Sequence, residues 1–207
     1  MRHHTYSGRS AKAARSVTPL RRPRGFTLIE LMVTLTVLAL LLSIAVPSFT
    51  RLLAANRLQA LSSELVAGLN LARSEAVRRA QPVTLRAEDA DSYSKGWRVF
   101  PDGNGNGSAT SATDDTDGKP LRQANASSGT PTIKRVTRSA AQPFSYSDAT
   151  TATDRMYVVF TSRGAITASN PAFFRICDPA NPTVHGRIVQ VNAVGKISID
   201  SVDATCP

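Results

Sequence analysis

The feature that most constrains this chain is an apolar run near its N-terminus, FTLIELMVTLTVLALLLSIAVPSF, at residues 26–49. About 20 apolar residues in a helix are enough to cross the hydrocarbon core of a bilayer. Glu30 is the only charged residue in the run. We therefore expect residues 26–49 to form a single transmembrane helix.

Basic residues before the run predict its orientation. Arg21, Arg22 and Arg24 come directly before Phe26, and the positive-inside rule keeps such a segment in the cytoplasm. The chain after residue 49 should then lie outside, as a head in the periplasm. A conventional secretory signal would be cut after its apolar core, but Ala-Val-Pro-Ser-Phe is a poor site of that kind.

The formal charge of +10 is unevenly distributed. Residues 1–25 contain seven of the 25 Lys and Arg and no acidic residue, which leaves +3 for the rest of the chain. If this segment is removed, the high isoelectric point says little about partners of the mature protein.

The sequence around the start of the apolar run, Arg-Gly-Phe-Thr-Leu-Ile-Glu-Leu at residues 24–31, resembles the class III signal of type IV pilins and pseudopilins. The resemblance implies that residues 1–25 are a leader, that a prepilin peptidase cuts after Gly25, and that the new N-terminal Phe26 is methylated. A glycine at this point suits an extended substrate, and cutting before the apolar run keeps the anchor.

Glu30 is the next residue to which the resemblance assigns a role. An ionised carboxylate in a membrane helix costs several kcal/mol unless it is paired. In the resembling family the partner is the N-terminal amine of a neighbouring subunit, so Glu30 would set the register of assembly. Pairing with the amine of the chain's own Phe26 is the alternative.

Residues 50–81 predict an amphipathic continuation of the helix. Apolar residues recur at a spacing of three and four, and polar residues occupy the other face. The proposed apolar stripe is Phe49, Leu52, Leu53, Leu58, Leu61, Leu65, Leu69, Ala72 and Ala76. Pro47 should kink or locally melt the helix, and Gln81-Pro82 should end it.

Residues 82–207 predict a mostly antiparallel β head, so that the fold class is α+β with a long helix packed on the head. Short apolar runs separated by Gly-containing turns indicate the strands. Residues 102–130 lack apolar periodicity and predict a long mobile loop. The expected strands are 83–87, 97–100, 132–138, 156–161, 172–177, 187–192 and 196–199.

Motifs in the head resemble those of the GspH/FimT family of minor pilins and pseudopilins. They are Gly-Trp-Arg-Val-Phe at 96–100 with Asp-Gly-Asn-Gly after it, Phe-Thr-Ser-Arg-Gly at 160–164, and the closing segment 185–197. The resemblance implies a minor pilin that primes type IV pilus assembly as part of a tip complex. The H-type minor pseudopilin of a type II secretion system fits the same motifs.

The implied partners are other minor and major pilins or pseudopilins, the prepilin peptidase and the inner-membrane assembly platform. The implied location is the bacterial inner membrane, then the pilus tip or pseudopilus.

The two cysteines, Cys177 and Cys206, lie near the C-terminus. An even cysteine count in an exported protein favours a disulfide over a metal site. Such a bridge closes a loop of roughly 30 residues and is worth about 3 kcal/mol in the chain-entropy model.

The sequence predicts no enzyme, cofactor or metal site. After Gly25 the only histidine is His185, and both thiols are expected to be oxidised, so no catalytic triad can be assembled. Asp-Gly-Asn-Gly-Asn-Gly at 102–107 matches the first half of a calcium loop. Position twelve, however, is Thr113 where a glutamate is needed, and a plain turn is the preferred interpretation.

DNA binding is the remaining hypothesis, and DNA is the less favoured partner. Some FimT-type minor pilins that act in natural transformation bind DNA through a Gly-Arg-x-Arg motif, with arginines on phosphates. The matching turn here is Gly-Lys-Ile-Ser at 195–198, which lacks the second basic residue. The candidate contacts are Arg163, Arg175, Arg187 and Lys196, with ordinary exposed strand charges as the alternative.

Overall fold

The structure is a computed structural model. It describes residues 25–90, 92–108, 120–127, 129, 131–139, 146–150, 156–167, 171–181, 183–204 and 206, and for 201–204 only the backbone. The chain divides into two compact units, Met1–Ser43 and Ile44–Pro207, which we describe separately. Residues 1–24 of the leader and residues 109–119 of the proposed mobile loop lie outside the described residues.

Helix α1 (Leu28–Arg79) runs through both units. Its N-terminus is capped by Thr27, whose hydroxyl accepts a hydrogen bond from the Glu30 amide at 3.2 Å. At the other end Ala80 has a positive φ of 53° and Pro82 follows, as the sequence predicted. The helix continues through Pro47, so the local melting that we expected there is not found. A proline removes one backbone hydrogen bond, and the helix extends well beyond it on both sides, from Leu28 to Arg79.

The buried stripe of α1 begins later than the sequence indicated. Phe49, Leu52 and Leu53 are exposed, and Ala54 is the first buried position. Leu61 is half-buried. The buried residues of the helix are Ala54, Leu58, Ser62, Leu65, Gly68, Leu69, Ala72 and Ala76. The prediction was wrong for the first three positions because apolar spacing shows which side of a helix is apolar, and not what covers it.

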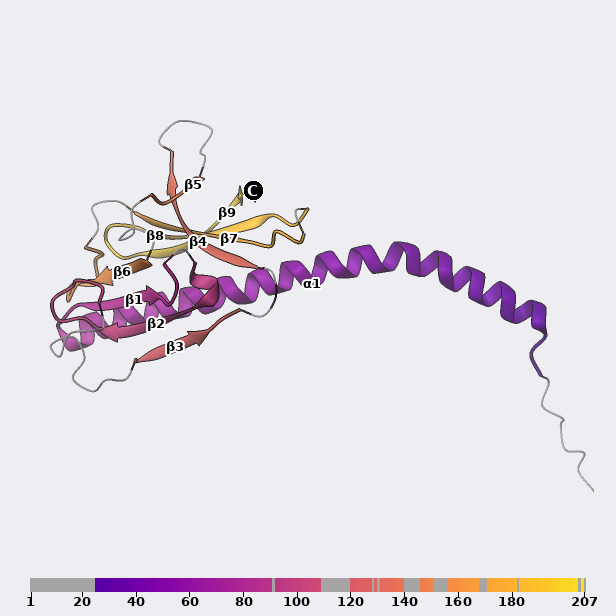
Figure 1. The fold of residues 1–207 in the computed structure, drawn as a ribbon, viewed down its shortest axis with the longest axis horizontal. Coiled ribbons are helices and arrows are strands. Elements are labelled where there is room, and N and C mark those ends of the chain that lie inside the picture. The colour runs from indigo at the N-terminus through magenta and orange to yellow at the C-terminus, as the bar shows by residue number, and fades with distance from the viewer. Residues whose placement is uncertain are drawn as a thin grey trace, which may run out of the picture. The chain divides into compact units, whose positions relative to one another are not determined.

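Two antiparallel sheets form the rest of the second unit (Figure 1). The first has the strand order β3-β2-β1-β6 and the second β5-β4-β7-β8-β9. The strands of the first are β1 (Val83–Ala87), β2 (Gly96–Pro101), β3 (Arg122–Asn125) and β6 (Tyr157–Phe160). Those of the second are β4 (Thr132–Arg138), β5 (Tyr146–Asp148), β7 (Ala172–Cys177), β8 (Gly186–Val191) and β9 (Ile197–Ala204). A short 3-10 helix, η1 (Tyr93–Lys95), precedes β2.

All seven strands expected from the sequence are present, and β3 and β5 were missed. β3 lies inside the segment that we predicted as a mobile loop, so that prediction was wrong for residues 122–125. Its sequence, Arg-Gln-Ala-Asn, has no apolar alternation. Pairing with β2 makes it a strand: Trp97 lies opposite Ala124 and Val99 opposite Arg122.

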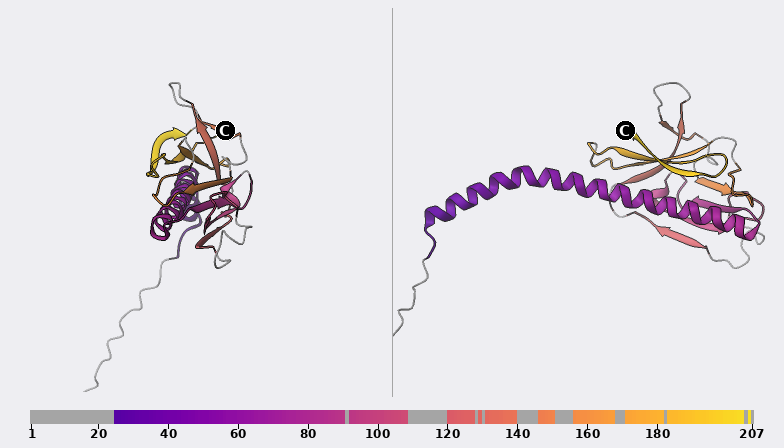
Figure 2. Two further views of the ribbon diagram at one scale, coloured as in Figure 1. Left: turned by 90° about the vertical axis from the view of Figure 1, so that its left-hand side faces the viewer. Right: turned by 180° about the vertical axis from the view of Figure 1, so that it is seen from behind.

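The C-terminal part of α1 and the inner faces of both sheets share one core. It contains Leu58, Leu65 and Leu69 from the helix together with residues of both sheets, such as Leu85 and Phe174. Figure 2 shows this part of the helix alongside both sheets. The ring of Tyr93 packs edge-to-face on Phe174 with the centroids 5.1 Å apart, and burial raises the Tyr93 pKa to about 12.

Gly68 determines how closely the helix approaches β2. A Cβ atom at this position would lie 2.2 Å from the nearest atom of the Trp97 ring, far inside van der Waals contact. This role was not predictable from the sequence, because an isolated glycine in a helix indicates only a weak helix former.

We expect Gly68→Ala to destabilise the head by about 1–3 kcal/mol, because overpacking outweighs the gain in helix propensity. Urea unfolding of a fragment that begins at Arg51 measures the change. Ala67→Gly at the exposed neighbouring position is the control for propensity alone. A stabilisation of about 1 kcal/mol in Gly68→Ala would show that the Trp97 contact does not matter.

Candidate assembly and binding sites

The first candidate site is the start of α1. Thr27 and Glu30 have the spacing of a capping box, in which the first residue caps the helix and the second is a Glu three positions later. Glu30 is exposed, and its carboxylate has no hydrogen bond or ion pair with any described residue. A negative charge in the first turn is also favoured by the helix dipole. The site therefore holds a carboxylate that is available to a positive partner.

Residues 25–53 of the described chain are all exposed. Exposed apolar side chains follow one another along α1, including Phe26 (83%), Leu28 (76%) and Ile44 (72%). This is the one described helix that is long and apolar enough to cross a membrane. A continuous apolar surface of this extent is unfavourable in water, and a bilayer or neighbouring helices would cover it.

The proposed processing site precedes the helix. Gly25 and Phe26 are non-helical and exposed, and a Cβ at Gly25 would have nothing within 4 Å. An extended, accessible peptide bond is what a protease needs. The basic residues of the leader, Arg21, Arg22 and Arg24, lie outside the described residues.

The expected disulfide is present in the head. Cys177 at the end of β7 is bonded to Cys206, with the Cα atoms 5.7 Å apart. Gly186 at the start of β8 lies against the bridge, since a Cβ there would be 2.7 Å from the Cys206 sulfur and 2.9 Å from the Cys177 sulfur. The bond thus fastens the C-terminal end of the chain to the second sheet.

We expect replacement of both cysteines by serine to lower the free energy of unfolding by about 3 kcal/mol, from loss of the constraint on the unfolded chain. Denaturant unfolding with and without reductant measures this. Reductant should destabilise the parent head and leave the double variant unchanged. Two free thiols in the non-reduced parent, counted by alkylation and mass spectrometry, would contradict the assignment.

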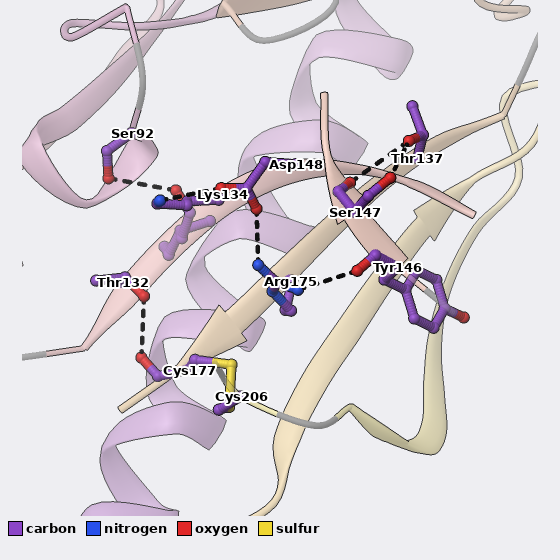
Figure 3. A network of polar contacts seen from close by, with 11 residues as sticks. Ser92, Thr132, Lys134, Thr137, Tyr146, Ser147, Asp148, Arg175, Cys177 and Cys206 are labelled. Carbon is purple, nitrogen blue, oxygen red and sulfur yellow. Dashed lines mark hydrogen bonds and ion pairs between the residues drawn. A yellow bond between two sulfur atoms is a disulfide. The ribbon is translucent and has the colours of Figure 1, made fainter. Parts of the chain in front are cut away.

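Arg175, one of the proposed DNA contacts, is engaged within the head (Figure 3). It is 9% exposed. Its guanidinium donates to the Tyr146 carbonyl at 3.2 Å and to the Asp148 carboxylate at 2.7 Å. Lys134 also pairs with Asp148, at 3.1 Å. These bonds hold the short strand β5 against β4 and β7, so the evident role of Arg175 is structural.

The other basic candidates are not gathered around Arg175. Arg187 lies opposite Ile176 on β7, and Arg175 lies opposite Ile188 on β8. Because side chains alternate along a strand, the two arginines occupy opposite faces of the sheet. The idea of a single patch made by adjacent strands is therefore wrong. DNA binding itself stays a prediction.

Arg163 and Lys196 do come from neighbouring turns. Arg163 precedes Gly164, and Lys196 follows Gly195, and a Cβ on Gly195 would be 1.8 Å from the Gly164 carbonyl oxygen. Arg73 of α1 donates to the same carbonyl at 3.1 Å. Both glycines have positive φ angles, 76° and 77°, which residues other than glycine rarely adopt. The two turns and the helix thus meet at this carbonyl.

The calcium-like segment is a turn organised by Asp102, which is completely buried. Its carboxylate accepts hydrogen bonds from the Thr84 hydroxyl at 2.5 Å and from the Gly107 amide at 2.8 Å. The side-chain oxygens of Asn104 and Asn106 accept hydrogen bonds from the backbone amides two residues further on. These oxygens are therefore used in forming the turn. Thr113 lies outside the described residues.

Comparison with protein families decides the class. The family described as type II transport protein GspH matches residues 61–195. The chain belongs to the GspH family. The prokaryotic N-terminal methylation motif matches residues 20–46, which include Gly25, Phe26 and Glu30.

The solved structure of one minor pilin agrees in fold. The type IV minor pilin FimU of Pseudomonas aeruginosa strain PAO1 is 26% identical, with a TM-score of 0.51, over 70% of this chain and 89% of FimU. The minor pseudopilin EpsH of the Vibrio cholerae type 2 secretion system is 12% identical, with a TM-score of 0.45, over 73% of this chain and 98% of EpsH. No significant match was found among curated proteins.

These findings confirm the family resemblance and the pilin-like fold. The chain is a structural, non-enzymatic GspH-family protein, a minor pilin or pseudopilin of a type IV pilus or a type II secretion system. Its methylation motif and apolar N-terminal helix are those of an inner-membrane prepilin.

Proposed function

We propose that the protein is a minor pilin that primes type IV pilus assembly as part of a tip complex. The observation that carries the proposal is the exposed apolar half of α1 with Glu30 near its start. Such a surface suits two successive environments, the bilayer before assembly and the helices of neighbouring subunits after it.

Processing creates the partner that Glu30 needs. Cleavage between Gly25 and Phe26 by the prepilin peptidase frees an amine at Phe26, and methylation keeps that amine basic. A carboxylate in apolar surroundings is costly unless it meets a positive charge. The Phe26 amine of an adjacent subunit therefore pairs with Glu30, and only one axial position of the incoming helix satisfies this pair.

The likeness to FimU, which its title calls a type IV minor pilin, supports the pilus as host. The proposed partners are other minor and major pilins and the inner-membrane assembly platform. The helix stays in the inner membrane with the head in the periplasm until the subunit is extracted into the tip.

A second candidate is the H-type minor pseudopilin of a type II secretion system. The name of the matching family, type II transport protein, favours it. The roles of Gly25, Phe26 and Glu30 would be the same. This candidate predicts that the full chain co-purifies from detergent with secretion pseudopilins and not with pilins.

We expect Gly25→Val to leave the precursor uncut, because the bulk of a branched side chain does not fit where the peptidase accepts a residue without a side chain. Immunoblotting of membranes measures processing, with the peptidase-deficient strain as the size standard for the uncut precursor. Gly25→Ala is the conservative control. A mature-sized band in Gly25→Val would refute the cleavage site.

We expect Glu30→Ala to be processed normally but to be absent from sheared filaments and tip complexes, since the pair with the neighbouring amine is lost. Glu64→Ala removes another exposed carboxylate from α1 and should assemble like the parent. Normal incorporation of Glu30→Ala would refute the role of Glu30 in setting the register.

A further inference from the structure

An open groove of about 780 Å³ lies beside the C-terminal half of α1. One flank of the helix and Arg122 of β3 line it. The helix contributes Ala67, Leu71, Ser74 and Val77, which are spaced by three and four and so lie on one side. This flank is next to the buried stripe and is not covered by either sheet: Val77 is 54% exposed.

The strand at the groove is open on one side. Among the described strands, β3 is at the end of its sheet and pairs only with β2. Arg122 and the buried Ala124 are two residues apart, so they share the face that looks toward the helix. The Arg122 guanidinium lies 5.7 Å from the centre of the Trp97 ring, and that ring contacts Gly68 of α1. A strand added to the free edge of β3 would therefore place alternate side chains in the groove.

The charge of the groove is positive. Arg73, Arg78 and Arg122 line it. Glu75 forms ion pairs with Arg78 and Arg79 and is not part of the lining. The neighbouring arginines lower the pKa of Glu75, so it stays ionised. The groove thus offers an apolar floor, a cationic rim and an unpaired strand edge.

We propose that this groove binds an extended acidic segment of a partner protein, which joins β3 as an additional strand. Apolar side chains of the segment contact Leu71 and Val77, and its carboxylates meet the arginines. A nucleic acid would leave both the strand edge and the apolar floor unused. The inference goes beyond the proposed function and does not depend on which machine contains the protein.

The test uses the full chain in detergent and a fluorescent ten-residue peptide of the repeat Leu-Ser-Glu-Ser, which places leucine and glutamate on the same face of a strand. Fluorescence anisotropy should show saturable binding. A peptide with lysine in place of glutamate should bind at least about tenfold more weakly, a difference of about 1.4 kcal/mol. A proline at the central leucine of the acidic peptide should abolish binding, because proline cannot donate to a strand.

Ser74→Glu places a negative charge in the groove and should weaken binding of the acidic peptide by about tenfold or more. Its hydroxyl donates only to the Leu71 carbonyl within the helix, so the substitution should not disturb the head, and thermal unfolding checks this. Ser63→Glu, at an exposed position of α1 outside the groove, should bind like the parent.

Equal binding of the acidic and basic peptides would overturn the proposal. So would an unchanged affinity of Ser74→Glu, or an acidic peptide that binds equally well with the central proline. Salt-sensitive binding of single-stranded DNA that Ser74→Glu abolishes, without binding of the peptide, would assign the groove to nucleic acid and also refute it.

Discussion

The structure depends on the contact between the C-terminal part of α1 and the inner faces of two small sheets. Leu58, Leu65 and Leu69 have no exposed surface, and residues of both sheets pack in the same cluster. No other described α-helix covers the inner face of either sheet, and the short helix η1 adds Tyr93 to the same core. Burying such side chains is worth about 1.5–3 kcal/mol each, and Gly68 allows the helix close enough to the Trp97 ring to do so.

The same helix serves a second purpose before Ala54, where no described element covers it. A single chain in water could not keep so long an apolar surface exposed. One helix therefore both completes the core of the head and carries the apolar surface that requires a membrane or a filament. Thr27 and Glu30 mark its beginning, where the helix is capped and where assembly is proposed to be registered.

Strong local patterns made much of this fold predictable from the sequence. The bounds of β1, β4 and β7 follow from short apolar runs, and the leader motif is visible as a string of residues. The strands β3 and β5 were not predictable, because their few polar residues become strands only through their neighbours. The structural role of Arg175 was not predictable for the same reason, because its partner Asp148 is on β5.

The available signals were also incomplete at the helix. Phe49, Leu52 and Leu53 fit the apolar stripe equally well whether a sheet, a lipid or another helix covers them, so their exposure could not be foreseen. The helix start at Thr27 was predictable from the Thr-x-x-Glu spacing, and the structure forms the Thr27 half of that motif, in which the hydroxyl accepts from the Glu30 amide.

The most direct test of the central claim is a clean in-frame deletion, scored in parallel for surface pili with twitching, type II secretion and DNA uptake, with the parent gene restored as the control. We expect the deletion strain to have fewer or no pili, and the parent gene to restore them. Loss of secretion alone would assign the protein to the type II secretion system. Loss of transformation alone would favour a role as a DNA receptor. Normal pili and normal secretion together would contradict a role as an assembly subunit.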